Sequence, residues 1–466
     1  MVNEPENNKR ITHMARAILR LGITGLFALV WIRHYSHYVF GIHFVFGTFL
    51  SIVFYYFIYN WFCDIYKAFR FASTSITEIV FSQFISFGIT DFIFYVLSCV
   101  SDHQMLNIIP GMATVIIQLL VTAVVVQRTK QMLMKHLYKE KTLIIKGNLM
   151  DYSDAESFVS RLEKKFDYLF EITQIIGENE SEDNIKRAID ENHNTILFDI
   201  SEKNRGILIR YCLQNNKQFF VSPRIEDIII QGCKSRHLLD TPLWKYEYSY
   251  NDDVYDLLKR IIDIVLSLLL IIVLSPFMLL TAIVIKLEDH GPVLYRQMRV
   301  TKDGKTFSIM KFRSMAEDAE KTGPIPSTQN DPRITKVGRV IRACRFDEIP
   351  QLFNILSGSM SFVGPRPERV EHVEMYTKDM PEFVYRNKVK AGLTGYAQVY
   401  GKYNTSPYDK LRLDLIYIEN RTLLLDLKVL LLTIRTIFQK ESTEGFKDGK
   451  SKQINLRVSE DSNRFI

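Results

Sequence analysis

The sequence predicts a membrane protein with four transmembrane helices, a middle α/β domain, and a mixed, mainly α-helical C-terminal domain that begins with a re-entrant membrane hairpin. Three observations predict this organisation. The first 130 residues hold long apolar runs, strands alternate with helices between residues 141 and 250, and a further apolar run broken by proline precedes a charged region. Hydrophobic residues make up 47% and charged residues 24% of the chain, which excludes a disordered or collagen-like protein.

Residues 1–140 form the predicted transmembrane domain. About 20 mostly apolar residues are needed to cross the hydrocarbon core of a bilayer. Four runs come close to this length: residues 17–32, 38–62, 76–100 and 105–127. Lys67 and Arg70 lie between the second and third runs, and Arg128 and Lys130 follow the fourth. The positive-inside rule therefore places both ends of this domain in the cytosol, and Arg33 is the one charge that disagrees.

Residues 141–250 form the predicted middle domain. Short β-rich segments alternate there with polar helical stretches, at residues 142–145, 168–176, 195–200 and 218–222. Such alternation predicts a parallel sheet of Rossmann-like type. The first strand leads into Lys146, Gly147 and Asn148 without the GxGxxG turn that binds dinucleotide phosphates. We therefore expect a scaffold, dimerisation or regulatory role for this domain.

Residues 251–290 form the predicted re-entrant membrane helix. The apolar run of residues 261–285 is long enough to span a membrane, but Ser275 and Pro276 lie in its middle. Proline removes a backbone donor and kinks a helix, and the freed carbonyl groups can be satisfied by Ser275 or by neighbouring groups. A kinked spanning helix and a hairpin of two short arms both fit this pattern. The charged, Lys- and Arg-rich region that follows favours the hairpin, which returns the chain to its own side of the membrane, whereas a straight spanning helix would place that region outside.

Residues 291–445 form the predicted C-terminal domain, and an acidic pair stands out in it. Asp347 and Glu348 come just before Pro350, which suits the first turn of a helix, and Gly358 offers a C-terminal stop. The backbone donors and dipole at a helix start favour an anion, whether a carboxylate or a phosphate. An isolated Asp-Glu pair is usually an ordinary helix cap. Only the cations around this pair favour another role.

Five basic residues accompany the acidic pair in the sequence: Lys311, Arg313, Arg339, Arg342 and Arg366. Arg366 is held between two prolines whose fixed φ angles limit the loop that presents its guanidinium. The planar fork of arginine fits phosphate oxygens. Lys311 and Arg313 are two apart on a predicted strand, so we expect them to point to the same side. Taken singly, each could instead belong to a solvated face or contact anionic lipids.

Several stretches together carry a resemblance to a known family. They are Lys259, Arg260 and Asp263 with Ser275 and Pro276, KFRSM (311–315), NDPRITKVGR (330–339), DEIPQL (347–352), GPRPE (364–368) and AGLTGYAQV (391–399). From Lys259 to about residue 445 the chain resembles the bacterial sugar transferase family. With the regions before it, the chain resembles the long-form, monotopic polyprenyl-phosphate phosphosugar transferases that initiate exopolysaccharide, capsule or O-antigen synthesis. Ala391 stands where many relatives have proline, a departure that we expect to loosen one turn.

The resemblance implies a reaction. Asp347 would be the nucleophile that attacks the sugar-linked phosphate of a UDP-sugar, releases UMP and carries the phosphosugar as an aspartyl phosphate. Undecaprenyl phosphate would then attack this intermediate and leave as a diphosphate-linked sugar. Glu348 matches the family's metal-associated acid and is the candidate ligand for Mg²⁺. The long architecture favours UDP-glucose or UDP-galactose as the donor.

The resemblance also divides the basic residues. Lys311, Arg342 and Arg366 match basic positions of the family site and should hold phosphate groups, while Arg313 and Arg339 are the weaker candidates. Three further acids are typical of the family, and each could either anchor structure by pairing with an arginine or touch substrate: Asp263, Asp331 and Asp414.

The expected location is the bacterial inner or cell membrane, as a multi-pass protein with its catalytic domain on the cytosolic face. The expected partners are a UDP-sugar, undecaprenyl phosphate and membrane lipids, with a homodimer left open. The net charge of +7 is modest, and the positive residues lie next to apolar segments, where they suit anionic lipids. A nucleic-acid partner is therefore not expected. Five cysteines without CxxC spacing predict neither a zinc site nor a disulfide framework. The tail, residues 446–466, should be mobile.

A second function remains open at this point. The large region outside the predicted catalytic domain also fits a catalytically silent membrane scaffold that regulates polysaccharide assembly. The presence of Asp347, Glu348 and Arg366 together favours the enzyme.

Overall fold

The computed structural model describes residues 6–40, 44–71, 74–136, 139–147, 158–163, 169–246, 253–316, 331–401 and 405–437. The chain divides into two compact units, Met1–Pro223 and Arg224–Ile466. The tail expected to be mobile, residues 446–466, lies outside the described residues.

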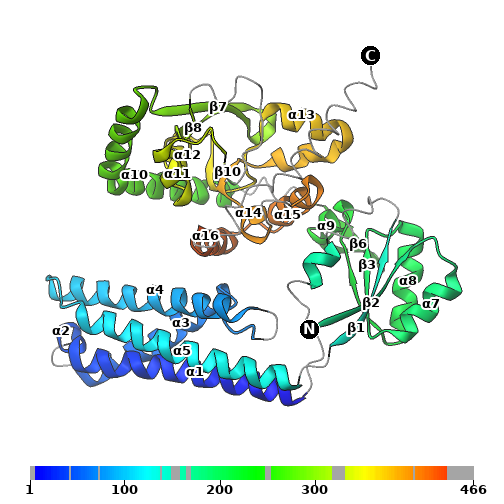
Figure 1. Ribbon diagram of the computed structural model, residues 1–466, viewed down its shortest axis with the longest axis horizontal. Coiled ribbons are helices and arrows are strands. Elements are labelled where there is room, and N and C mark those ends of the chain that lie inside the picture. The colour runs from blue at the N-terminus through cyan, green and yellow to red at the C-terminus, as the bar shows by residue number, and fades with distance from the viewer. Residues whose placement is uncertain are drawn as a thin grey trace. The chain divides into compact units, whose positions relative to one another are not determined.

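Four long helices form the apolar part of the first unit. They are α1 (Glu6–His34), α3 (Phe44–Ile65), α4 (Ile76–Asp102) and α5 (Ile109–His136), with a short helix α2 (Ser36–Phe40) after α1. Each of the four is long and apolar enough to cross a membrane, and they run side by side (Figure 1). The predicted run 38–62 is divided between α2 and α3. Helices of this length and apolar composition are those expected of a membrane protein.

Aromatic rings close the interior of this bundle. The ring of Phe27 in α1 stacks on that of Tyr55 in α3, with 3.7 Å between ring centroids. The Tyr59 hydroxyl donates to Gln83 Oε1 in α4 at 2.6 Å. The buried polar groups of these residues are thus paired inside the bundle, while outward-facing residues such as Phe46 and Phe57 are exposed. An apolar outer surface of this kind suits contact with lipid.

The rest of the first unit holds a four-stranded parallel sheet with the order β2-β1-β3-β4. The strands are β1 (Glu140–Lys146), β2 (Phe170–Gly177), β3 (Asn194–Phe198) and β4 (Gln218–Val221), connected in part by α7 (Glu182–Glu191) and α8 (Glu202–Gln214). The prediction of a parallel sheet from strand–helix alternation is confirmed. The predicted strands lie within two residues of the observed ones, except that residue 168 is outside the described residues.

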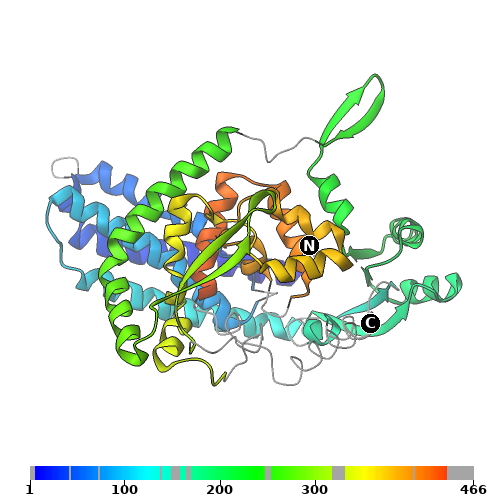
Figure 2. The same cartoon turned by 90° about the horizontal axis from the view of Figure 1, so that it is seen from above.

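The second unit is mainly helical, with small sheets of two strands each. Its first elements are α9 (Ile225–Gln231), the antiparallel hairpin β5 (Lys234–Leu238) and β6 (Thr241–Lys245), and α10 (Asp253–Asp289). Figure 2 shows the β5–β6 hairpin projecting from the unit, and all its strand residues are exposed. A second antiparallel hairpin consists of β7 (Leu294–Val300) and β8 (Thr306–Phe312), joined through the short turn η3 (Lys302–Gly304).

Most of the remaining elements of this unit surround one hydrophobic core, while α11 (Lys336–Ala343) and η4 (Phe346–Glu348) pack in a smaller cluster with Ile285 and Phe312. The elements around the larger core are α12 (Gln351–Ser357), β9 (Ser361–Val363), α13 (Val370–Asp379), η5 (Pro381–Lys388), β10 (Gly392–Thr394), α14 (Tyr396–Tyr400), α15 (Pro407–Glu419) and α16 (Leu423–Ile437). Leu352 and Ile355 of α12, Phe383 of η5 and Leu411 and Leu415 of α15 are buried together in this core. The expected mixed, mainly α-helical domain is confirmed.

Helix α10 departs from the expected pair of separate arms. It is one helix of 37 residues with Pro276 inside it, and its ribbon changes direction along its length (Figure 1). Pro276 has no N–H to donate to the carbonyl of Ile272 four residues earlier. The Ser275 hydroxyl donates to that carbonyl at 2.8 Å instead. The helix therefore continues through the proline, because the freed acceptor is satisfied, as the sequence predicted for Ser275.

The N-terminal part of α10 is tied to the core by polar contacts. Arg260 donates through both terminal nitrogens to the carbonyls of Ile355 and Leu356, at 2.7 and 2.8 Å. These carbonyls lie at the C-terminal end of α12, where helix acceptors lack partners within the helix. Asp263 Oδ1 accepts from the backbone N–H of Phe362 at 3.1 Å. Asp263 is thus structural, although its partner is strand β9 and not the arginine that the sequence suggested.

Candidate functional site

The acidic pair lies in a tight turn directly before a helix. Asp347 and Glu348 belong to the 3-10 turn η4, and α12 begins after Pro350. Gly358 ends α12 in the left-handed region, with φ of 90°. The predicted helix start and stop are therefore confirmed. Phe346 belongs to the same turn, and its ring lies parallel to that of Phe312 in β8, at an interplanar angle of 5°. This contact helps to fix the turn.

Glu348 is held between two cations. Its Oε1 accepts from Lys311 Nζ at 2.8 Å and from Arg366 Nη2 at 2.9 Å. Burial favours the neutral acid, but attraction to Lys311 and Arg366 outweighs it and holds the pKa of Glu348 well below its usual range. Glu348 is therefore an ionised carboxylate at neutral pH.

The carboxylate of Asp347 differs from that of Glu348 in its contacts. It accepts no hydrogen bond and forms no ion pair within the described part of the chain. Burial and, second, the charge of Glu348 raise the pKa of Asp347, while the charges of Lys311, Arg342 and Arg366 oppose that rise. The pair thus consists of one carboxylate whose charge is compensated and one whose oxygens remain available to a ligand.

The structure brings only some of the predicted cations to this pair. Lys311 and Arg366 touch Glu348, and the charge of Arg342 acts on Asp347 from α11. Arg339 lies one turn earlier on α11, is exposed and makes no contact with either carboxylate among the described residues. The family resemblance ranked Arg339 below Arg342, and the structure agrees that only the charge of Arg342 acts on Asp347.

Arg313 is a correction to the sequence analysis. Its side chain is 7% exposed and forms an ion pair with Asp289, away from Glu348. The alternation expected for Lys311 and Arg313 holds only inside a strand, and β8 ends at Phe312. Arg313 is the first residue after the strand, although its N–H still donates to the Val293 carbonyl at 2.9 Å, and its side chain packs where a Cβ on Gly291 would lie 2.0 Å from Nη1.

Sequence reasoning missed Arg345. It stands between α11 and η4 in the left-handed region, with φ of 55°, and its charge acts on both Glu348 and Asp347. Burial lowers the pKa of Arg345. The signal was present, since Arg345 continues the spacing of three that relates Arg339 and Arg342. Its place at the site nevertheless depends on the turn that follows the helix.

The loop that presents Arg366 is held by separate donors at four successive carbonyls. Those carbonyls belong to Pro365, Arg366, Pro367 and Glu368, and their donors are Gly392 N at 2.9 Å, Arg386 Nη2 at 2.9 Å, Arg299 Nη1 at 3.3 Å and Val300 N at 3.1 Å. The prolines limit φ, as the sequence predicted. The tertiary contacts then fix the direction of the whole loop. None of these four donors was singled out from the sequence.

Ala391 does not loosen its turn. The backbone N–H of Ala391 donates to Thr301 Oγ1 at 3.1 Å, and its carbonyl accepts from Ser361 N at 2.9 Å. A proline at this position would lack the first of these bonds. The expectation of a looser turn is therefore wrong, because alanine supplies a donor that the surrounding structure uses.

A buried ion pair supports this loop. Arg386 donates from Nε and Nη2 to Asp414 Oδ2 at 3.0 and 2.7 Å, and the same Nη2 reaches the Arg366 carbonyl. Glu368 lies 3.9 Å from Arg386 and 3.8 Å from His372. Burial alone would raise the pKa of Glu368, but the contact with His372 and the charge of Arg386 bring it down to about 2. Because Asp414 is buried and Arg386 donates to it through two nitrogens, Asp414 has a structural role.

Asp331 is structural as well. Its Oδ2 pairs with Arg333 Nη2 at 2.5 Å, and its Oδ1 accepts from the backbone N–H of Arg333 at 3.0 Å. Its side chain is 3% exposed. Of the three acids that left two roles open, Asp331 and Asp414 pair with arginines, and Asp263 with backbone and a serine.

The acidic pair suits one mode of magnesium binding. Mg²⁺ usually binds one or two carboxylates and completes its shell with water and substrate phosphates. Only Oε1 of Glu348 is engaged by described residues, so its second oxygen and the Asp347 carboxylate are available as ligands. The described residues contain no group of three or more His, Cys, Asp or Glu side chains that could hold a metal by themselves. The donor set fits an ion shared with substrate.

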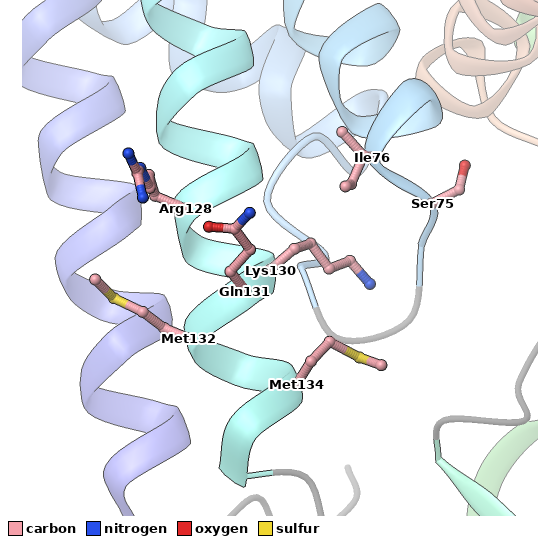
Figure 3. A pocket seen from close by; sticks show the side chains of 7 residues that line it. All are labelled: Ser75, Ile76, Arg128, Lys130, Gln131, Met132 and Met134. Atoms are coloured by element: carbon pink, nitrogen blue, oxygen red, sulfur yellow. The ribbon is translucent and has the colours of Figure 1, made fainter.

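A cavity in the first unit is a different kind of site. It has a volume of about 660 Å³ and lies at the ends of α4 and α5. Its lining consists of Ser75, Ile76, Arg128, Lys130, Gln131, Met132 and Met134. Figure 3 shows Lys130 and Met134 extending from α5 toward the start of α4. The lining includes no carboxylate and no other strong nucleophile, so this cavity is not the candidate active site.

Comparison with known proteins agrees with the site in the second unit. The profile of the family described as "Bacterial sugar transferase" matches residues 254–440, the part that holds both acids and all five predicted cations. The chain is 43% identical over 187 residues to UDP-N-acetylgalactosamine-undecaprenyl-phosphate N-acetylgalactosaminephosphotransferase of Aeromonas hydrophila, covering 40% of this chain and 44% of that protein.

Two further relatives carry one name, UDP-glucose:undecaprenyl-phosphate glucose-1-phosphate transferase. The protein of Klebsiella pneumoniae is 40% identical over 210 residues, covering 44% of this chain and 43% of the relative. The protein of Caulobacter vibrioides is 39% identical over 192 residues, covering 40% of this chain and 72% of the relative. The chain thus matches less than half the length of the first two relatives and most of the third. By its matched profile and this coverage, the chain belongs to the bacterial sugar transferase family.

Proposed function

We propose that the protein transfers a sugar 1-phosphate from a UDP-sugar to undecaprenyl phosphate, with release of UMP, and so initiates polysaccharide synthesis. The observation that carries the proposal is the asymmetry of the acidic pair. Asp347 has an available carboxylate, and Glu348 beside it is clamped by Lys311 and Arg366. The names of the relatives, which state this kind of transfer for those proteins, support this reaction class.

The first step uses Asp347 as a nucleophile. A carboxylate oxygen of Asp347 forms a bond to the sugar-linked phosphorus, and the bond from this phosphorus to the bridging oxygen breaks. The electron pair stays on that oxygen, so UMP leaves as a phosphate dianion. Lys311, Arg342 and Arg366 would neutralise the phosphate charge, since their charges already act on Asp347.

The second step returns Asp347 to its starting state. A phosphate oxygen of undecaprenyl phosphate attacks the phosphorus of the aspartyl phosphate, and the bond to the Asp347 oxygen breaks. The carboxylate regains its electron pair, and the sugar leaves as a diphosphate-linked lipid. One set of cations serves both steps, because each transfers the same phosphoryl group to or from one carboxylate.

Mg²⁺ is the proposed cofactor. Glu348, with Asp347 and substrate phosphates, would hold it, and when bound the ion would supply further neutralisation of phosphate charge. Arg366 and Lys311 would keep Glu348 oriented toward this position through their bonds to Oε1.

We further propose the following organisation. Residues 1–140 form a transmembrane domain of four spans, residues 141–250 a Rossmann-like cytosolic domain, residues 251–290 a re-entrant membrane helix, and residues 291–445 the catalytic domain on the cytosolic face of the bacterial inner or cell membrane. Support comes from α10, which contains the most apolar 18-residue segment among the five described helices that could cross a membrane, with a mean hydropathy of 2.9. A site beside such a helix can meet a lipid phosphate without extracting its apolar tail.

The test separates the two steps. The full chain in lipid nanodiscs is mixed with Mg²⁺ and a panel of UDP-sugars in the absence of lipid phosphate, with UDP-glucose and UDP-galactose as the favoured donors. We expect up to one UMP per protein and a phosphosugar adduct on Asp347, detected by intact-mass and peptide spectrometry. Lys378→Gln, an exposed charge change on α13, should behave as wild type. UMP release without any adduct would exclude the two-step route, and the absence of UMP even with lipid phosphate would exclude the proposed function.

A further inference from the structure

Lys410 in α15 is a cation that the proposed reaction has not used. It is half-buried, and its ammonium makes no hydrogen bond or ion pair within the part of the chain that the structure describes. Asp414 lies one helical turn further along, on the same side of α15. Asp414 Oδ1 is buried without a hydrogen-bond partner, yet Lys410 does not donate to it. The ammonium is therefore directed elsewhere.

The contacts around Asp414 place Lys410 beside the Arg366 loop. Asp414 holds Arg386, and Arg386 donates to the backbone carbonyl of Arg366. In agreement with this arrangement, the charges of Glu368, Arg386, Arg366 and Asp414 all act on Lys410. Glu368 is already engaged by Arg386 and His372. Arg366 thus faces Glu348 with its guanidinium and also has Lys410 within range of its charge.

The charge of an ammonium in this position is only partly compensated. Burial lowers the pKa of Lys410, and Arg386 and Arg366 contribute in the same direction, while the charges of Glu368 and Asp414 oppose the shift without reversing it. A partly desolvated cation near two guanidinium groups is stabilised when an anion enters between them. At the acidic pair, by contrast, Lys311 and Arg366 each direct a donor to Glu348. Only part of their capacity remains for substrate.

We propose that Lys410 and Arg366 form a second phosphate-binding position of the same site. The inference rests on the proposed function for the identity of the phosphates. A phosphosugar transfer between a nucleoside diphosphate sugar and a lipid phosphate involves more than one phosphate group, and the group under attack at Asp347 occupies one position. The second position takes a phosphate ester, either the nucleotide-side phosphate of the donor or the phosphate head of the lipid acceptor.

Direct binding tests the position without requiring turnover. The full chain in nanodiscs is titrated with UDP in one arm and with undecaprenyl phosphate in the other, at about 0.15 M salt, where the Debye length is about 8 Å. The variants are Lys410→Gln, Lys410→Arg and the matched control Lys378→Gln. Thermal melting of each variant confirms that the proteins compared are folded. Because UDP carries no sugar, the measurement does not depend on the sugar specificity.

The expected result is a loss of affinity of about tenfold for one of the two probes in Lys410→Gln, the size of one charge-assisted contact. Lys410→Arg should recover most of that affinity, and Lys378→Gln should match wild type. Weaker UDP binding assigns the position to the donor, and weaker lipid phosphate binding assigns it to the acceptor. Unchanged binding of both probes in a folded Lys410→Gln protein overturns the inference. Absence of turnover in wild type would count only against the proposed function.

Discussion

The second unit contains two places where a carboxylate meets a guanidinium, and they differ in whether a neighbouring carboxylate is left without a bonded cation. Asp414 and Arg386 are 1% and 4% exposed, and two nitrogens of Arg386 donate to one oxygen of Asp414. At the acidic pair, Arg366 is 41% exposed and contacts Glu348 through one nitrogen, while Asp347 accepts no hydrogen bond among the described residues. The first group is closed to ligands and the second is open. The same residue types therefore build a support in one place and a reactive group in the other.

The largest expected effect separates activity from folding. Asp347→Asn should lower phosphosugar transfer on the order of 10⁴-fold, as expected for loss of a nucleophile. It should not lower the melting temperature. The pKa of Asp347 is raised in the folded state, so its charged form opposes folding above the usual carboxylate pKa, and removing the charge relieves this. Transfer assays and thermal melting of the same preparation measure both effects, and a lower melting temperature would contradict the comparison.

The second substitution should have the reverse effect, a loss of stability. Asp414→Ala should destabilise the second unit by about 3–5 kcal/mol, because it leaves the buried guanidinium of Arg386 without its partner. Denaturant unfolding or thermal melting measures the loss. Asp409→Ala is the control on the same helix, since Asp409 is 35% exposed and its partner Arg412, itself 7% exposed, also lies over the ring of Tyr408, and its effect should be clearly smaller than that of Asp414→Ala. Equal effects of the two variants would show that burial does not distinguish them.

A third substitution tests whether the fork of Arg366 is needed beyond its charge. Arg366→Lys keeps the charge but loses the planar arrangement of donors, so one ammonium must serve both Glu348 and phosphate. We expect kcat/KM to fall about 10- to 100-fold, the cost of one to two charge-assisted hydrogen bonds, with a small change in melting temperature. Steady-state kinetics on UDP-sugar checks this, and full activity of the lysine variant would exclude a forked contact.

A smaller effect concerns the bend in α10. Ser275→Ala removes the donor to the Ile272 carbonyl that Pro276 leaves without its helical partner, which should cost about 1 kcal/mol. Thr281→Val is the matched control, because Thr281 also bonds a helix carbonyl, that of Phe277, but no proline follows to remove the backbone donor to it. Thermal melting in nanodiscs compares the two. A loss as large in Thr281→Val would remove the special role of Ser275.

The smallest effect acts through space. The charge of Arg342 lowers the pKa of Asp347, so Arg342→Gln should raise it, and activity that needs ionised Asp347 should then fall at a higher pH as the solution is acidified. Arg339→Gln changes the same charge on the same helix and should leave the pH profile in place. The acid side of the kcat/KM profile measures both variants, and equal shifts would mean that only net charge matters.

The sequence predicted much of the fold and some of the residues at the site. Apolar runs marked the long helices, alternation marked the parallel sheet, and Pro350 and Gly358 marked the helix after the acidic pair. Lys311, Arg342 and Arg366 were assigned to the site because they match basic positions of the family that the chain resembles. These features depend on neighbours in the chain, which a pattern of residues records directly.

Only the tertiary structure separated Arg313 and Arg339 from the acidic pair, added Arg345, and connected Asp414 through Arg386 to the carbonyl of Arg366. It also placed Lys410 near the same loop. Such relations depend on where strands end and which helices pack together, and they join residues far apart in the chain. Residue type and spacing determined which groups could bind phosphate. Packing decided which of them are already satisfied and which remain available, because burial and partners, not composition, set the charge and reach of each group.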